Sequence, residues 1–231
     1  MPDSGYQSFT RRVLSGAASR LRRYAELAEA RNLELQLRDE GSENARSIPT
    51  WTSKDELEAL YRLGAGCPEN GSIVEIGSYL GASTCFLGAG APASVRITCV
   101  DTWQNETMPD GLRDTFAEFQ RNTAGLGSRV HVIRKASAEV QPSDLPESIH
   151  LALIDADHSY EATKADARLV LPHMAPDGIV AFHDTATFAG VSSVLSEILA
   201  EREWCLAGHL INLTWLRRAA WSPWPPTGSG K

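Results

Sequence analysis

The fold is decided by the stretch Val74-Glu75-Ile76-Gly77-Ser78-Tyr79-Leu80-Gly81-Ala82-Ser83-Thr84. A short apolar strand runs into a glycine-containing turn and then into a helix. Gly77 permits a sharp turn, and Gly81 opens the helix where a side chain would block the approach of a ligand. The spacing differs from the dinucleotide fingerprint GxGxxG, because the two glycines are separated by three residues that include Tyr79. The stretch predicts a strand–loop–helix that binds a nucleoside-containing ligand; the alternative is a tight turn with no ligand.

Strands and helices alternate outward from this stretch. The expected strands cover residues 72–76, 95–100, 130–134, 149–154 and 179–182, and Asp177-Gly178 is expected to turn the chain into the last of them. Helices are expected at residues 53–63, 81–88, 112–124, 159–171 and 191–200, the first of them opened by a capping box of Ser53 and Glu56. Buried strands separated by helices indicate βαβ units and a parallel sheet. Residues 204–216 are typical of two further strands.

A long N-terminal helix is expected at residues 9–40. Apolar residues recur there at three- and four-residue spacing, at Val13, Leu14, Ala17, Leu21, Tyr24, Leu27 and Ala28. The arginines Arg11, Arg12, Arg20, Arg22 and Arg23 fall in a stretch that contains no acid. A basic amphipathic helix can lie on a membrane, but Glu26, Glu29 and Glu34 dilute the charge of the second half. We expect an arm at residues 1–47 that serves as an oligomer contact or as a lid, a domain at residues 48–219 and a flexible tail at residues 220–231.

Composition restricts the class of protein. The 231 residues carry a net charge of −7, which argues against nucleic acid as the main partner, because such binding relies on Lys and Arg. Four widely spaced cysteines without a CxxC pair argue against a zinc site or a disulfide framework. No apolar run approaches the roughly 18–20 residues that span a bilayer, and the N-terminal arginines are not followed by the apolar segment of a secretory signal. We expect a soluble cytoplasmic protein.

Polar residues follow the carboxyl ends of the expected strands, where ligands of open α/β sheets bind. They are Glu75, Asp101, Ser137, Asp155, His158, His183 and Asp184. Asp101 stands twenty residues after Gly81, and a carboxylate at that place can accept both hydroxyls of a ribose. A lone Asp after a strand is commonly a turn former, but the preceding loop favours the ribose interpretation.

The run from Glu75 to Ser83 resembles the S-adenosylmethionine (SAM)-binding loop of the catechol O-methyltransferase group and of the bacterial small-molecule methyltransferases of family 24. The resemblance extends from about Thr52 to Arg217 and leaves the N-terminal helix outside it. It implies a class I SAM-dependent methyltransferase with an α/β, Rossmann-like fold. The sheet of that fold has seven strands and is mostly parallel, with the last strand antiparallel; the N-terminal helical arm is an addition to it.

The resemblance also implies a cofactor site. The residues assigned to it are Glu75, Gly77, Ser78, Tyr79, Gly81, Ser83, Thr84, Asp101, Thr102, Trp103, Ser137, Ala138 and Asp155. Among these, the first loop holds the methionine end of SAM, Asp101 takes the ribose, Trp103 lies beside the adenine and Ser137 contacts the adenine edge.

The ends of the fourth and fifth strands resemble the two metal motifs of the family. The resemblance implies that Asp155, His183 and Asp184 hold Mg²⁺ or another divalent cation. The sequence departs from the catechol pattern in two places: His183 stands where an oxygen ligand is commonest, and His158 occupies the place of the lysine base. Imidazole suits Mn²⁺, Fe²⁺ or Zn²⁺ better than Mg²⁺, and a histidine is a competent base at neutral pH.

Two mechanisms remain open for these side chains. In the first, a cation acidifies an acceptor hydroxyl while His158 takes its proton; in the second, His158 forms a base dyad with Asp155 or Asp184 and no metal takes part. The expected function is O-methylation of a hydroxyl on a small molecule or sugar by a homo-oligomer. The rivals are a nicotinamide-dependent oxidoreductase, which the absent GxGxxG disfavours, and a catalytically silent SAM-binding module that works through its N-terminal arm.

Overall fold

The computed structural model describes residues 4–39, 42–106 and 111–219. Its strands are β1 (Ser72–Ile76), β2 (Arg96–Asp101), β3 (Val130–Arg134), β4 (Ile149–Ile154), β5 (Met174–Phe182), β6 (Trp204–Leu210) and β7 (Leu213–Arg218). They form one seven-stranded sheet in the order β3-β2-β1-β4-β5-β7-β6. Strands β1 to β5 are parallel, and β7 pairs antiparallel with both β5 and β6. The expected seven-stranded sheet with a last antiparallel strand is therefore confirmed.

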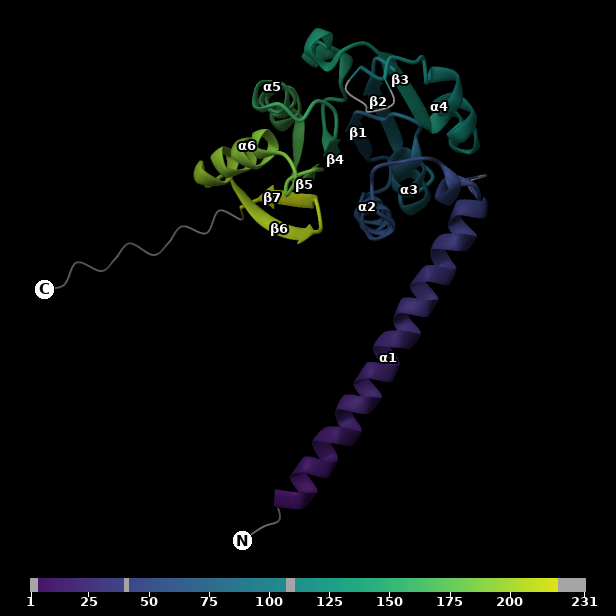
Figure 1. Ribbon diagram of the computed structural model, residues 1–231, viewed down its shortest axis with the longest axis vertical. Coiled ribbons are helices and arrows are strands. Elements are labelled where there is room, and N and C mark those ends of the chain that lie inside the picture. Colours follow the sequence, from purple (N-terminus) through teal and green to yellow (C-terminus); the bar gives the residue numbers. More distant parts are fainter. Residues whose placement is uncertain (1–3, 40–41, 107–110, 220–231) are drawn as a thin grey trace, which may run out of the picture.

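Helices cover both faces of the sheet (Figure 1). They are α1 (Ser4–Asp39), α2 (Lys54–Ala65), α3 (Ala82–Gly90), α4 (Phe116–Asn122), α5 (Tyr160–Val170) and α6 (Ala189–Ala200). Short 3-10 turns lie at Ala45–Ser47, Ala124–Arg129, Ser137–Glu139, Pro142–Asp144 and Leu171–His173. Side chains alternate across the central strands, as a period of two requires. In β4, Leu151 and Leu153 join the cluster with α2 and α3, whereas Ala152 and Ile154 join the cluster with α5 and α6.

Backbone hydrogen bonds continue the parallel ladder past the ends of the strands. The amide of Gly77 donates to the carbonyl of Val100 on β2, and the amide of Asp155 donates to the carbonyl of Ile76 on β1. In the same way the amide of His183 donates to Ile154 on β4. The first residues after three neighbouring strands are thus held in register at one edge of the sheet.

Two element boundaries between β2 and the end of β5 differ from the sequence expectation. The helix expected at residues 112–124 is shorter, because α4 ends at Asn122 and a 3-10 turn follows. The turn expected at Asp177-Gly178 lies inside β5, which begins at Met174. The pairing with β4 jumps from Ile149↔Met174 to Leu151↔Ile179, so the extra residues of β5 form a bulge rather than a separate turn.

The N-terminal helix is longer than expected and leaves the body of the protein over most of its length (Figure 1). Its last turns belong to the core, since Leu33 and Leu37 are buried with residues of α3. The tail expected at residues 220–231 lies outside the described residues. Within the described residues, no helix has the length and apolar character required to cross a bilayer.

Candidate functional site

A cavity of about 750 Å³ opens at the carboxyl edge of the sheet. Its walls include residues of the loops that follow β1, β2, β3, β4 and β5. Residues assigned to a site from the sequence that line this cavity are Gly77, Ser78, Tyr79, Ser83, Asp101, Thr102, Ser137, Asp155, His158, His183 and Asp184. Its volume lies within the range of small-molecule and cofactor sites.

Asp101 fastens the loop after β1. One carboxylate oxygen accepts hydrogen bonds from the amides of Ser78 (2.9 Å) and Tyr79 (2.8 Å), and the other accepts from the amide of Trp103 (2.7 Å). Tyr79 and Trp103 both have a positive φ, an uncommon backbone state for residues other than glycine. A carboxylate offers about four acceptor positions. Asp101 therefore uses most of its capacity to shape the loop.

Glu75 supports the same loop from inside the core. Its side chain is fully buried and accepts hydrogen bonds from Ser78 Oγ (2.6 Å) and from Thr84 Oγ1. Burial raises the pKa of this carboxyl, although the hydroxyl groups that donate to it lower the pKa in part. Neither Glu75 nor Thr84 is among the cavity-lining residues. The contacts of Glu75 in the described residues therefore orient the loop from inside the core.

The two glycines of the loop are required for packing between protein segments. A Cβ on Gly77 would lie 2.1 Å from the carbonyl oxygen of Asp155. A Cβ on Gly81 would lie 2.7 Å from Thr123 Cγ2, and Gly81 does not line the cavity. The expectation that Gly81 clears space for a ligand is therefore wrong. A larger side chain at this position is excluded by Thr123, which follows α4, and is disfavoured by the positive φ of 88°.

Trp103 is displaced from its expected place beside an adenine. Its side chain is fully buried and packs against Phe116 and Phe119, with ring centroids 5.1 and 4.7 Å away. The left-handed backbone at this residue accompanies a side chain that points into the core. Neither Trp103 nor Ala138 is among the cavity-lining residues, whereas Thr102 and Ser137 are.

Two carboxylates and two imidazoles meet after β4 and β5. Nε2 of His158 lies 3.2 Å from Asp184 Oδ2 and 3.6 Å from Asp155 Oδ1. Nδ1 of His183 lies 3.2 Å from Asp155 Oδ1 and 3.6 Å from Asp184 Oδ2. These distances bring together the four side chains that the sequence assigned to a metal site or to a base dyad. The ring of His158 also stacks on Phe188, with centroids 4.4 Å apart.

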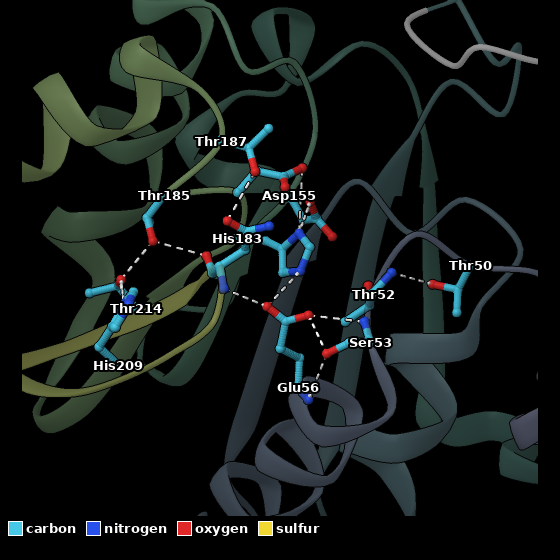
Figure 2. A network of polar contacts seen from close by, with 12 residues as sticks. Thr50, Thr52, Ser53, Glu56, Asp155, His183, Thr185, Thr187, His209 and Thr214 are labelled. Carbon is cyan, nitrogen blue, oxygen red and sulfur yellow. Dashed lines mark hydrogen bonds and ion pairs between the residues drawn. The ribbon is translucent and has the colours of Figure 1, made fainter.

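Glu56 is a member of this cluster that the sequence did not reveal (Figure 2). Its carboxylate is buried, with Oε1 located 3.6 Å from His183 Nε2 on the side of the ring opposite Asp155. The same oxygen accepts from the amide of Asn212 (2.7 Å), and Oε2 accepts from Ser53 in the expected capping box. The capping motif accounts for Glu56 completely at the level of sequence. Only the packing of α2 against the end of β5 brings it to His183.

The carboxylates favour a positive charge between them. Burial lowers the pKa of His183, but the charges of Asp155 and Asp184 outweigh burial and raise it to about 11. Burial likewise lowers the pKa of His158, whereas the neighbouring carboxylates raise it above its ordinary value of 6.5. Burial raises the pKa of Asp155, but the two histidines bring it below its ordinary value.

The donor set fits a divalent cation. Ligand atoms of Asp155, His158 and Asp184 lie within 4.8 Å of one another. Nδ1 of His183 faces the same two carboxylates, and among the described residues neither ring nitrogen of His183 has a hydrogen-bond partner of good geometry. Mixed imidazole and carboxylate ligands suit Mn²⁺, Fe²⁺ or Zn²⁺. A ligating histidine commonly donates its second N–H to a carboxylate, the place that Glu56 takes beside His183.

Comparison with protein families matches residues 74–185 to the model of a methyltransferase domain. A curated relative, the uncharacterized protein y4gI of Sinorhizobium fredii, is 29% identical over 117 residues, which are 49% of this chain and 13% of the relative. The chain thus corresponds to a small part of that protein.

Solved structures share the fold. The O-methyltransferase NovP superposes with a TM-score of 0.59 at 17% identity, over 71% of this chain and 79% of NovP. An O-methyltransferase from Bacillus cereus, solved in complex with S-adenosylhomocysteine (SAH), gives a TM-score of 0.55 at 18% identity, over 81% of this chain and 90% of that chain.

Proposed function

This chain carries a class I methyltransferase domain, and from that premise we propose that it transfers the methyl group of SAM to a hydroxyl of a small molecule or sugar. The observation that carries the proposal is the shared cavity: the loop held by Asp101 forms one wall, and the cluster of Asp155, His158, His183 and Asp184 forms another. A donor and an acceptor bound there would lie side by side, which converts a bimolecular reaction into one between oriented groups.

The loop after β1 supplies the cofactor contacts in this proposal. Ser78, Tyr79 and Ser83 would hold the methionine end, Asp101 would bind the ribose with its remaining acceptor capacity, and Ser137 would contact the adenine edge. Bound SAM supplies a methyl group activated by the positively charged sulfur. The chain itself binds and orients both reactants and excludes water from the space between them.

Asp155 and Asp184 would hold a divalent cation together with one imidazole. In the arrangement that leaves Nε2 of His158 free as a base, this imidazole is His183, and the carboxylate of Glu56 lies behind it. A cation at this place would lower the pKa of an acceptor hydroxyl. His158, which is partly exposed to the cavity, would then take the hydroxyl proton at Nε2. The second candidate mechanism dispenses with the cation and leaves His158 as the base, oriented by Asp184 at 3.2 Å.

Titration calorimetry with SAH and with NADH tests the cofactor assignment. We expect SAH to bind and NADH to give no heat; the opposite pattern would favour an oxidoreductase. Incubation with methyl-labelled SAM and a panel of phenols, catechols and nucleotide sugars tests the reaction itself. A protein that binds SAH but labels no acceptor would instead be a silent binding module.

Replacing Asp101 by Asn is expected to weaken SAH binding by about 10- to 100-fold. The amide cannot accept from Ser78, Tyr79 and Trp103 at once, because one of its two ends is a donor, and a hydrogen bond to a charged group contributes about 1.5–3 kcal/mol. Calorimetric titration with SAH measures the change. The matched control is Asp114→Asn, an exposed carboxylate that accepts from the amide of Phe116 outside the cavity and is expected to leave the affinity unchanged. Equal SAH affinities for the two variants would show that Asp101 does not contribute to the cofactor site.

Removal of divalent cations is expected to lower turnover by about a hundredfold or more, since a Lewis acid contributes several kcal/mol to such reactions. The protein is treated with EDTA, desalted and assayed with and without Mn²⁺, Mg²⁺ or Zn²⁺. Restoration by one of these ions supports the cation, and Asp184→Ala should not be restored. Full turnover after EDTA treatment would establish the metal-free base dyad instead.

A further inference from the structure

Helix α1 contacts the body of the protein through one face at its C-terminal end only. Its 36 residues correspond to a rod of about 54 Å. Leu33 and Leu37 are 1% and 2% exposed, and Asn32 Nδ2 donates to the hydroxyl of Tyr61 (3.1 Å). Toward the N-terminus the helix extends into solvent (Figure 1).

The opposite face of α1 carries an apolar stripe without a partner among the described residues. Leu21, Tyr24 and Leu35 are 69%, 70% and 42% exposed. Successive residues of a helix are rotated by about 100° around its axis. Leu21, Tyr24, Leu35 and Ala28 therefore all lie within about 40° of the side of the helix that faces directly away from Leu33 and Leu37. The positions 21, 24, 28, 31 and 35 follow the three- and four-residue spacing of a coiled-coil seam, interrupted only by Arg31. The sequence continues the same spacing to Leu14 and Ala17.

An exposed apolar stripe of this kind is expected to pack against another apolar surface. Most of the stability of a helix in a protein comes from packing of its apolar face, and large exposed apolar side chains in a row mark an interaction surface. The cavity is not the target, because no described residue of α1 is among those that line it. The expectation that the arm is a lid therefore has no support in the structure.

The distribution of charge along α1 points to the partner. Residues 4–23 contain five arginines and no acid, whereas residues 24–39 contain four acids and two arginines. A parallel pair of copies would place the two arginine blocks against each other and both domains at the same end. An antiparallel pair places each arginine block beside the acidic block of the other copy.

We propose that the stripe of Leu21, Tyr24, Ala28 and Leu35 binds the same stripe of a second copy of this chain, in an antiparallel pair of α1 helices. The two methyltransferase domains then lie at opposite ends of a helical rod. The interface does not depend on the assigned reaction, so an experiment that disproves the proposed function would leave this proposal unaffected.

Light scattering coupled to size exclusion measures the association of the full chain. We expect a mass of twice 25.1 kDa for the wild type. Leu21→Glu and Tyr24→Glu each place a carboxylate in the centre of the pair and are expected to raise the dimer dissociation constant by more than about a hundredfold. Ala18→Glu adds the same charge at an exposed position about 100° from the centre of the stripe and should remain a dimer. An unchanged thermal unfolding transition of the sheet domain verifies that each variant is folded.

Cross-linking determines the orientation. In an antiparallel pair centred on Leu21 and Tyr24, residue 14 of one copy lies level with residue 31 of the other, and both positions flank the stripe. The two copies of residue 14 are then about 25 Å apart. With Cys205 replaced by Ser and the other three cysteines buried, a short bis-maleimide should join Leu14→Cys to Arg31→Cys only when the two variants are mixed. Cross-linking of either variant with itself would show a parallel pair and overturn the proposal.

Two further outcomes would also overturn it. One is a wild-type chain that remains monomeric at concentrations up to about 100 µM, well above the dissociation constant of a stable pair. The other is a monomer that sediments with anionic phospholipid vesicles and loses this property in Leu21→Glu, because the stripe would then bind a lipid surface.

Discussion

Replacing Asp155 by Asn is expected to lower kcat for methyl transfer by about a thousandfold, within the range of general acid–base and cation-assisted effects. Oδ1 of Asp155 lies 3.2 Å from Nδ1 of His183 and 3.6 Å from Nε2 of His158, so one carboxylate oxygen contacts both imidazoles. Both candidate mechanisms depend on its charge: it is a cation ligand in the first and a partner of the base in the second. The isosteric amide retains the shape and removes the charge.

Steady-state kinetics with the best acceptor, together with calorimetry of SAH, measures this prediction. SAH affinity is expected to change by less than about tenfold, or 1.4 kcal/mol, so that the loss appears in kcat. Asp177→Asn is the matched control, because this exposed carboxylate lies within β5, the strand that His183 follows, and away from the carboxyl end of that strand. A kcat for Asp155→Asn close to that of the control would exclude the cluster from the reaction.

Replacing Gly77 by Ala is expected to destabilise the protein by about 2–5 kcal/mol and to abolish measurable SAH binding. The added methyl group would lie 2.1 Å from the carbonyl oxygen and 2.6 Å from the carbonyl carbon of Asp155. Both are backbone atoms, so the loops after β1 and β4 must separate; overpacking costs about 1–3 kcal/mol and the left-handed conformation a further 1–2 kcal/mol. Separation also moves Asp155 away from the histidines.

Urea denaturation measures the change in the free energy of unfolding, and Gly111→Ala separates the two contributions. Gly111 has a similar positive φ of 80°, but a Cβ there would meet no atom of the described residues within 4 Å. The control is therefore expected to lose only the 1–2 kcal/mol of backbone strain and to bind SAH normally. If both variants lost the same free energy of unfolding, the close approach of Gly77 to Asp155 would contribute nothing to the destabilisation.

The sequence predicted the parallel sheet and the polar residues that follow the carboxyl ends of its strands, because both depend on local patterns. Short apolar segments alternating with helices specify a parallel sheet, and parallel strands bring their carboxyl ends to one edge. Asp101, Asp155 and Asp184 each follow a strand directly, so their convergence could be inferred from chain order. The local bulge in β5 escaped prediction, since Asp177-Gly178 suits a turn and a bulge equally.

The tertiary structure decided what each residue at that edge does. Trp103 follows Asp101 closely in sequence, yet its left-handed backbone and the ring pair of α4 take it into the core. Glu56 has a complete local explanation as a capping residue, and only packing between α2 and the end of β5 gives it a second role beside His183.

The opening stretch from Val74 to Thr84 shows the same division. Its sequence determined a strand, a turn and a helix, because apolar runs and glycines act on the backbone locally. The structure decided that Gly77 is required by Asp155 and Gly81 by Thr123, residues about 80 and 40 positions away in the chain. Close packing between distant segments leaves no local signal, and for that reason it could be read only from the folded protein.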